Sequence, residues 1–149
     1  MKRLCIKFTV PGNPVGKMRP RFVRFAHQRP YTPEKTRTFE AAVAHEFWKA
    51  CGAPPIRPRL GRSLSFKGKQ PIMQADRVYV RCYFRNRANP DGDNVLKSVL
   101  DGLIGLAYTD DRHVGSAVFP CWDDPKNPRI EVTVIQNNQA GGGDALPDK

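Results

Sequence analysis

The sequence has 149 residues, which suits a single domain, and 40% hydrophobic with 9% aromatic residues is the composition of a globular protein, not a disordered one. The formal net charge is +11 but is unevenly spread. Residues 1–90 contain 20 Lys or Arg against four acidic side chains, whereas residues 91–149 contain five against ten. Such asymmetry indicates two working surfaces, and a basic surface of this size favours a nucleic-acid partner.

Several classes of protein are excluded by the same reading. No run of about 18 apolar residues occurs, so no membrane span is expected. The apolar residues of the N-terminus alternate with charged ones, which does not fit a signal peptide. The cysteines are scattered and lie in no zinc-binding spacing, which favours reduced thiols in the cytoplasm. They are Cys5, Cys51, Cys82 and Cys121. No small-molecule cofactor is expected.

The N-terminal third is predicted to contain a strand, a basic segment and a helix. Residues 4–10 alternate apolar with other side chains, as in a strand with one buried face. Residues 11–33 are rich in Pro, Lys and Arg and indicate a long basic loop or loose hairpin, which in a small domain is usually functional. The helix is expected to run to about residue 50, with Thr32 as its cap and Pro33 at its first position.

The remainder of the chain carries a second irregular basic segment at residues 53–75 and an amphipathic helix at residues 94–104. Three further segments are predicted as strands: residues 78–84, 114–120 and 129–135. The turn-rich sequence WDDPKNP joins the last two. The end of the chain is polar and rich in glycine, so we expect one domain over residues 1–136 and a disordered tail at 137–149.

The first acidic group lies in the sequence NPDGDN, which follows the strand predicted at residues 78–84. Asp91 and Asp93 are two residues apart, so their side chains point to the same side if the backbone is extended there. The simpler interpretation of an isolated pair is that Asp93 caps the next helix and Asp91 is a turn residue. An EF-hand loop fits poorly, because Val95 stands where a third oxygen ligand is needed and no glycine occupies the sixth position.

The helix after this motif adds two charged residues at helical spacing. Lys97 lies one turn after Asp93, and Asp101 lies one turn after Lys97, so all three share one side of the helix. They could form surface salt bridges worth a few tenths of a kcal/mol each. Alternatively, Lys97 lies beside an acidic site, where its charge can meet a phosphate.

Asp110 and Asp111 form the second acidic group. The intervening helix is about 16 Å long, and the extended residues after it span roughly 17–20 Å. The chain could therefore return Asp110 or Asp111 to Asp91 and Asp93, or a partner subunit could supply one group. Mg²⁺ or Mn²⁺ would relieve the repulsion among these carboxylates, polarise a phosphoryl oxygen and activate water. The pattern thus indicates metal-dependent phosphodiester hydrolysis.

The run PDGDNVLKSVLDGL, followed by the acidic pair at 110–111, resembles the RusA family of Holliday junction resolvases. GNPVGKMRPR and YTPEKT are similar to that family's basic segment and the start of its first helix, so the matches span most of residues 8–135. The sequence departs from the family at Asn89, where a lysine is common, and in its long 53–75 segment. The resemblance implies an α+β fold with a small mixed sheet of about four or more strands and two main helices.

The resemblance also implies a homodimeric, Mg²⁺-dependent endonuclease, bacterial or phage-encoded, that cuts four-way DNA junctions symmetrically in recombination and repair. Asp91, Asp93 and Asp111 would be catalytic metal ligands, Asp110 an accessory ligand, and Lys97 the residue at the scissile phosphate. The side chains expected along the DNA backbone are basic: Lys17, Arg19, Arg21, Arg24, Arg29, Lys67 and Lys69. One aromatic ring among Phe22, Phe25 and Tyr31 could stack at the crossover or simply pack.

Two alternatives stay open on the sequence: a basic nucleic-acid-binding protein without catalysis, and a flap or RNA nuclease with the same acidic site. A two-fold dimer is expected, because a four-way junction needs two cuts on opposing strands and two-fold symmetry supplies two sites. The expected dimer surface is an exposed apolar face on the strand at 78–86 or on that at 114–120.

Overall fold

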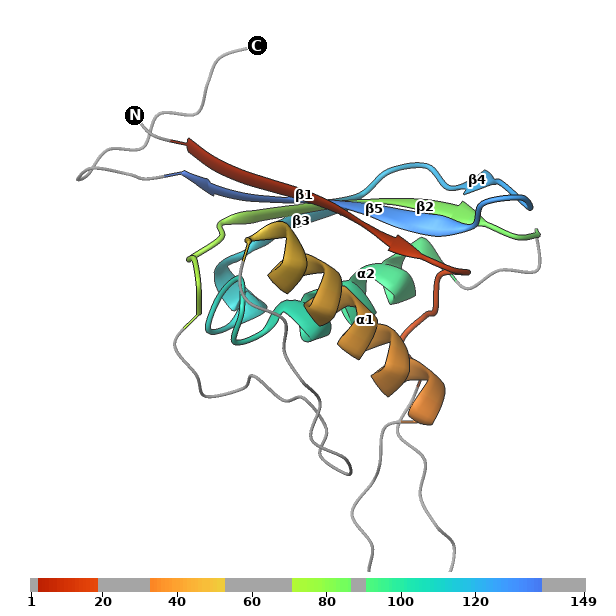
Figure 1. Ribbon diagram of the computed structural model, residues 1–149, viewed down its shortest axis with the longest axis horizontal. Coiled ribbons are helices and arrows are strands. Elements are labelled where there is room, and N and C mark those ends of the chain that lie inside the picture. Colours follow the sequence, from red (N-terminus) through yellow and green to blue (C-terminus); the bar gives the residue numbers. More distant parts are fainter. Residues whose placement is uncertain (1–2, 19–32, 53–70, 87–90, 138–149) are drawn as a thin grey trace, which may run out of the picture.

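The computed structural model describes residues 3–18, 33–52, 71–86 and 91–137 and shows an α+β fold, a mixed five-stranded sheet with two helices on one face (Figure 1). The strands are β1 (Arg3–Pro11), β2 (Arg77–Phe84), β3 (Gly115–Val118), β4 (Trp122–Asp123) and β5 (Arg129–Asn137). The helices are α1 (Glu34–Ala50), α2 (Gly92–Leu103) and the short 3-10 helix η1 (Asp111–His113). The predicted fold class is confirmed.

The order of the sheet is β1-β5-β2-β3, with β5 antiparallel to both of its neighbours. Along the other edge of β2, β3 pairs with its first half and β4 with its end, both in the parallel direction. Because β3 is parallel to β2, the chain must return from the end of β2 to its beginning. The segment that makes this return contains α2 and the second acidic group.

The strand predicted at residues 114–120 is shorter in the structure, and a second short strand follows it. β3 ends at Val118, and β4 forms from Trp122 and Asp123, which the sequence placed in a turn. Pro120 has no backbone N–H to donate to a ladder, so regular pairing is interrupted there. The backbone N–H of Phe119 still donates to Val80 O and that of Asp124 to Phe84 O, which keeps this edge attached to β2.

The hydrophobic core lies between the two helices and the sheet. α1 contributes Val43 and Phe47, and α2 contributes Val99 and Leu103, all fully buried. The alternating residues of the sheet meet them from above: Val78, Val80, Cys82, Ile130, Val132 and Val134. The alternation in β2 and β5 was therefore read correctly, but at the start of β1 Leu4 is exposed because the core does not extend that far.

Both long helices begin at residues slightly different from those predicted, and the shift in α2 changes the role of Asp91. α2 begins at Gly92, and its N-cap is Asp91, whose Oδ1 accepts a hydrogen bond from the backbone N–H of Asp93 at 3.3 Å. The capping role assigned to Asp93 is thus wrong. In α1 the N-cap is Pro33, one residue after the predicted cap Thr32, and it makes no side-chain capping bond. Thr32 lies outside the described residues.

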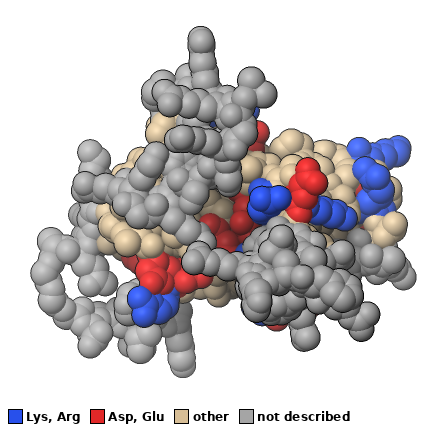
Figure 2. Space-filling model, turned by 90° about the horizontal axis from the view of Figure 1, so that it is seen from below, with Lys and Arg blue, Asp and Glu red and all other residues tan. Residues whose placement is uncertain are grey.

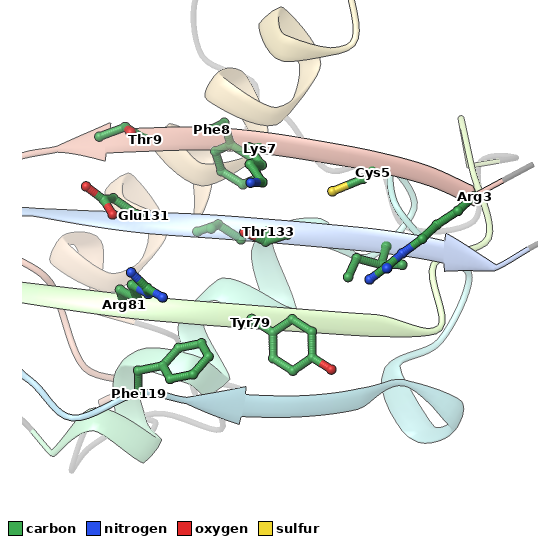
Figure 3. A pocket seen from close by; sticks show the side chains of 12 residues that line it. Arg3, Cys5, Lys7, Phe8, Thr9, Tyr79, Arg81, Phe119, Glu131 and Thr133 are labelled. Atoms are coloured by element: carbon green, nitrogen blue, oxygen red, sulfur yellow. The ribbon is translucent and has the colours of Figure 1, made fainter. Parts of the chain in front are cut away.

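The second face of the sheet carries polar and basic side chains around a shallow groove of about 760 Å³ (Figure 3). Arg3, Lys7 and Arg81 extend over this face, and Tyr79 and Phe119 lie on it with ring centroids 6.1 Å apart.

β5 continues through Asn137, one residue beyond the predicted domain, and the tail from 138 onward lies outside the described residues. Neither α1 nor α2 is long and apolar enough to cross a membrane.

Candidate active site

The first acidic group lies at the N-terminal end of α2. Asp91 is the N-cap and Asp93 is in the first turn, and both side chains are exposed. The backbone carbonyl of Asp91 accepts from the N–H groups of Asn94 and Val95, which fixes the start of the helix. Since the N-terminus of a helix favours negative charge, this position stabilises both carboxylates. Asp93 belongs to a helical turn and Asp91 is the non-helical cap before it, so the two residues do not lie in the continuous extended backbone that the sequence suggested.

Gly92, between the two aspartates, packs against the edge of the sheet. A Cβ atom at this position would lie 3.2 Å from Cys121 Sγ and 3.5 Å from the methyl groups of Val118. The glycine therefore lets the first turn of α2 approach β3 closely. Cys121 in turn lies beside the buried Cys82, whose thiol pKa is raised to about 12, first by burial and then by Cys121.

Lys97 lies one turn after Asp93 with an exposed side chain, and it forms no ion pair with any other described residue. The salt bridges that could link Asp93, Lys97 and Asp101 along the helix are not formed among the described residues. Asp101 pairs with another lysine instead. The ammonium group of Lys97 is therefore available, within the described part of the chain, to an anion that approaches this side of α2.

Lys17 is the lysine that pairs with Asp101. Its Nζ lies 2.5 Å from Asp101 Oδ2 and 2.8 Å from Glu40 Oε1 of α1. Its backbone N–H donates to Asn94 O at 2.9 Å, directly after Asp93 in the chain. Burial lowers the pKa of Lys17, but the hydrogen bonds and charges of Asp101 and Glu40 outweigh this effect and leave the pKa raised. Lys17 thus stays charged with two carboxylates around it.

The second acidic group lies near the other end of α2. The hydroxyl of Tyr108 donates to Leu100 O at 2.5 Å, so the chain has turned back beside the C-terminal half of the helix. Burial raises the pKa of Tyr108, and the nearby charges of Asp111 and Asp101 add to the rise. Asp111 therefore lies close to Tyr108. Leu100 lies about 10 Å along the helix axis from Asp93, at seven residues of 1.5 Å each.

Asp110 is already engaged by a cation. Its carboxylate accepts from Arg112 Nε at 2.8 Å and from the Arg112 backbone N–H at 2.9 Å. The hydrogen bonds from the Arg112 side chain and backbone hold the pKa of Asp110 below its usual value. An ion that bound Asp110 would have to compete with this guanidinium.

The four predicted metal ligands consequently fall into two groups at opposite ends of α2. Within the described residues, no group of three or more His, Cys, Asp or Glu side chains is close enough together to hold a metal ion. Figure 2, which looks at the helical side, shows the described acidic side chains in separate patches with basic side chains beside them. Through Tyr108 the chain returns beside Leu100, toward the opposite end of the helix from Asp91 and Asp93.

Six of the seven predicted DNA-binding residues lie outside the part of the chain that the structure describes. Arg19, Arg21, Arg24, Arg29, Lys67 and Lys69 lie outside the described residues, as do Phe22, Phe25, Tyr31 and Asn89. Lys17 is the one member of the set that is described, and its ammonium is occupied by two carboxylates.

The family model described as endodeoxyribonuclease RusA matches residues 11–135, which is most of the chain. The protein belongs to the RusA family. As a RusA protein it is an endodeoxyribonuclease, a Holliday junction resolvase, and the mixed sheet with two helices is consistent with that family. No individual curated protein matches the chain significantly.

Sequence reasoning missed three features of this RusA protein: the pairing of Lys17 with Glu40, its pairing with Asp101, and the packing of Cys121 against Gly92. Glu40 carried no signal, because a single acid in a helix is usually solvated. Asp101 did carry a signal, because it lies one helical turn after Lys97. That spacing indicated Lys97 as its partner and gave no indication of Lys17.

Proposed function

We propose that the protein resolves four-way DNA junctions by paired, symmetric, Mg²⁺-dependent nicks, with α2 as the catalytic element. The observation that carries this proposal is the exposed pair Asp91 and Asp93 at the helix N-terminus, with Lys97 one turn further on, exposed and in no ion pair with another described residue. Carboxylates for a cation and an ammonium for a phosphate thus lie on one short stretch of helix. Family membership supports the reaction class.

The donor set fits Mg²⁺ or Mn²⁺ in its chemistry. These hard ions take carboxylate oxygens and water, and Mg²⁺ is commonly bound by only one or two carboxylates together with substrate phosphates. In the proposal Asp91 and Asp93 hold the ion at the start of α2, and Lys97 binds the scissile phosphate. When bound, the metal would polarise the phosphoryl group and make water a better nucleophile.

We propose further that Asp111 reaches this site from the partner subunit, with Asp110 as accessory. The two acidic groups lie toward opposite ends of α2, so a two-fold axis that sets α2 antiparallel to its copy would place Asp111 of each chain near Asp91 and Asp93 of the other. Phe119 and Trp122 are 38% and 47% exposed at this sheet edge, but their rings lie against Tyr79 and Tyr83 on the face away from α2, so they do not belong to this contact.

The first experiment incubates labelled four-way and linear duplex DNA with the protein in Mg²⁺, in Mn²⁺ and in EDTA. Paired nicks confined to the junction, lost in EDTA and in Asp93→Asn, are the expected result. Tight junction binding by the wild type without cleavage at any concentration of either metal would contradict the proposal. Cleavage of flaps or RNA in preference to junctions would reassign the substrate.

The second experiment mixes two inactive variants, Asp93→Asn and Asp111→Asn, and allows the subunits to exchange. If the site is shared, a mixed dimer contains one site with only wild-type acids, and single nicks reappear. A mixture of Asp91→Asn with Asp93→Asn is the matched control and should stay inactive, because both changes affect the same group. Failure of the first mixture to nick, or a monomer mass by light scattering at micromolar concentration, would refute the shared site.

A further inference from the structure

Lys17 connects three parts of the chain that are distant in sequence. The residue lies after β1, its Nζ contacts Glu40 in α1 and Asp101 in α2, and its backbone N–H donates to Asn94 O in the first turns of α2. The side chains of Lys17, Glu40 and Asp101 are only 28%, 22% and 30% exposed. These contacts are thus more shielded from solvent than an ordinary surface salt bridge.

The surroundings of Lys17 show that this segment is anchored along its length. Asn13 Oδ1 accepts from the backbone N–H of Arg85 just past β2, and Pro14 is buried. The path after β1 therefore passes the end of β2 and then the first turns of α2, and its last anchor within residues 3–18 is Lys17. Arg19, the first arginine of the basic segment, follows two residues later in the sequence.

We propose that Lys17 is a positioning residue, which by binding Glu40, Asp101 and Asn94 O holds the first turns of α2, with Asp91 and Asp93, in fixed relation to α1 and to the start of the basic segment. It is not a contact to DNA phosphate. This inference rests on the proposed function, because the importance of the position depends on Asp91 and Asp93 being the catalytic acids.

The loss of the lysine has a clear physical consequence. Glu40 and Asp101 approach the same ammonium, so without it two carboxylates of different helices face each other uncompensated. Their repulsion acts to separate α1 from α2 and to shift the catalytic turn. Displacements of about 1 Å at a catalytic group can cost on the order of 100-fold in rate, so even a small shift is measurable.

The test compares wild type with Lys17→Met, which keeps the length of the side chain but removes its charge. Junction cleavage under saturating DNA should fall about 10- to 100-fold, while the slope of log binding affinity against log salt stays unchanged. Lys17→Arg should recover much of the activity, because a guanidinium can bind two carboxylates. Lys49→Met is the matched control, since Lys49 is an exposed lysine of α1 whose pair with Glu46 spans only one turn.

A measurement without DNA or metal separates this proposal from the proposed function. Amide hydrogen exchange of the peptide that contains Asp93 to Val99 should be several-fold faster in Lys17→Met than in wild type, and unchanged in Lys49→Met. Unchanged exchange together with unchanged turnover would overturn the positioning role. A salt slope reduced by about 1 with unchanged turnover would identify Lys17 as a phosphate contact instead. If wild type does not cleave junctions, the proposed function fails, and the exchange result still decides on the positioning.

Discussion

Gly102 of α2 lies directly against the backbone of Glu40 in α1. A Cβ atom at position 102 would be 2.9 Å from Glu40 O and 3.2 Å from Val43 Cβ, so the glycine permits a close approach of the two helices. The same Glu40 binds Lys17 through its side chain. The contact between Gly102 and Glu40 therefore affects both the crossing of α1 over α2 and the position of the carboxylate that binds Lys17.

We expect Gly102→Ala to destabilise the protein by about 1–3 kcal/mol, because the added methyl group meets a carbonyl oxygen that cannot move without the helix. Chemical denaturation monitored by circular dichroism measures the change. Gly115→Ala is the control, since its Cβ would meet Asp76 O at an ordinary 3.6 Å and its φ is not positive. Equal stability of the two variants would contradict the assigned packing.

Asp91 has two separable roles, as helix cap and as proposed metal ligand. Asn caps a helix about as well as Asp, but its neutral amide is a poor ligand for Mg²⁺. Asp91→Asn should therefore keep the stability of wild type within about 0.5 kcal/mol and lose Mg²⁺-dependent cleavage. Asp91→Ala should lose cleavage and, in addition, about 1 kcal/mol of stability. Full cleavage by Asp91→Asn would remove this residue from the site.

The contact between Gly92 and Cys121 predicts a compensating pair of substitutions. Gly92→Ala places a Cβ 3.2 Å from Cys121 Sγ, so the catalytic turn must shift by a few tenths of an ångström, and junction cleavage should decrease. Removal of the sulfur in Gly92→Ala/Cys121→Ala should restore much of the rate. Cys121→Ala alone serves as the control and should be nearly as active as wild type. If the cleavage rate of the double variant is lower than that of Gly92→Ala, the contact with Cys121 is not the cause of the loss in Gly92→Ala.

The cysteines should differ in reactivity at pH 8. Because the pKa of Cys82 is raised to about 12, almost none of it is thiolate at that pH, and its side chain is buried. Iodoacetamide should modify the exposed Cys5 and Cys121 in the native protein and reach Cys82 only on unfolding, as peptide mass spectrometry can measure. Rapid native modification of Cys82 would refute its burial.

The same pKa determines how stability varies in alkali. A thiol whose pKa is raised on folding favours the folded state below its unfolded pKa near 9, and this contribution is lost as pH rises through about 12. The free energy of unfolding should thus fall over this range. Cys82→Ala is less stable at neutral pH because of the cavity, but its decline with pH should be smaller.

Much of the fold followed from local patterns. The alternation in β2 and β5 predicted their buried faces because a strand has a period of two. The end of α2 was predicted by Gly105, which has a positive φ of 83° directly after the C-cap Ile104. The short strand β4 was missed, because the pairing of Trp122 and Asp123 depends on β2, almost 40 residues earlier in the chain.

The sequence by itself determined what lies within one helix: the succession of Asp91, Asp93 and Lys97 at the start of α2, since helical spacing fixes which side chains share a side. Only the tertiary structure decided which charges meet across elements. Lys17 pairs with residues 23 and 84 positions away, and Asp111 lies beside Tyr108, away from the first acidic pair. Spacing along the chain carries no information about such pairs, because the packing of α1 and α2 against the sheet sets their distances.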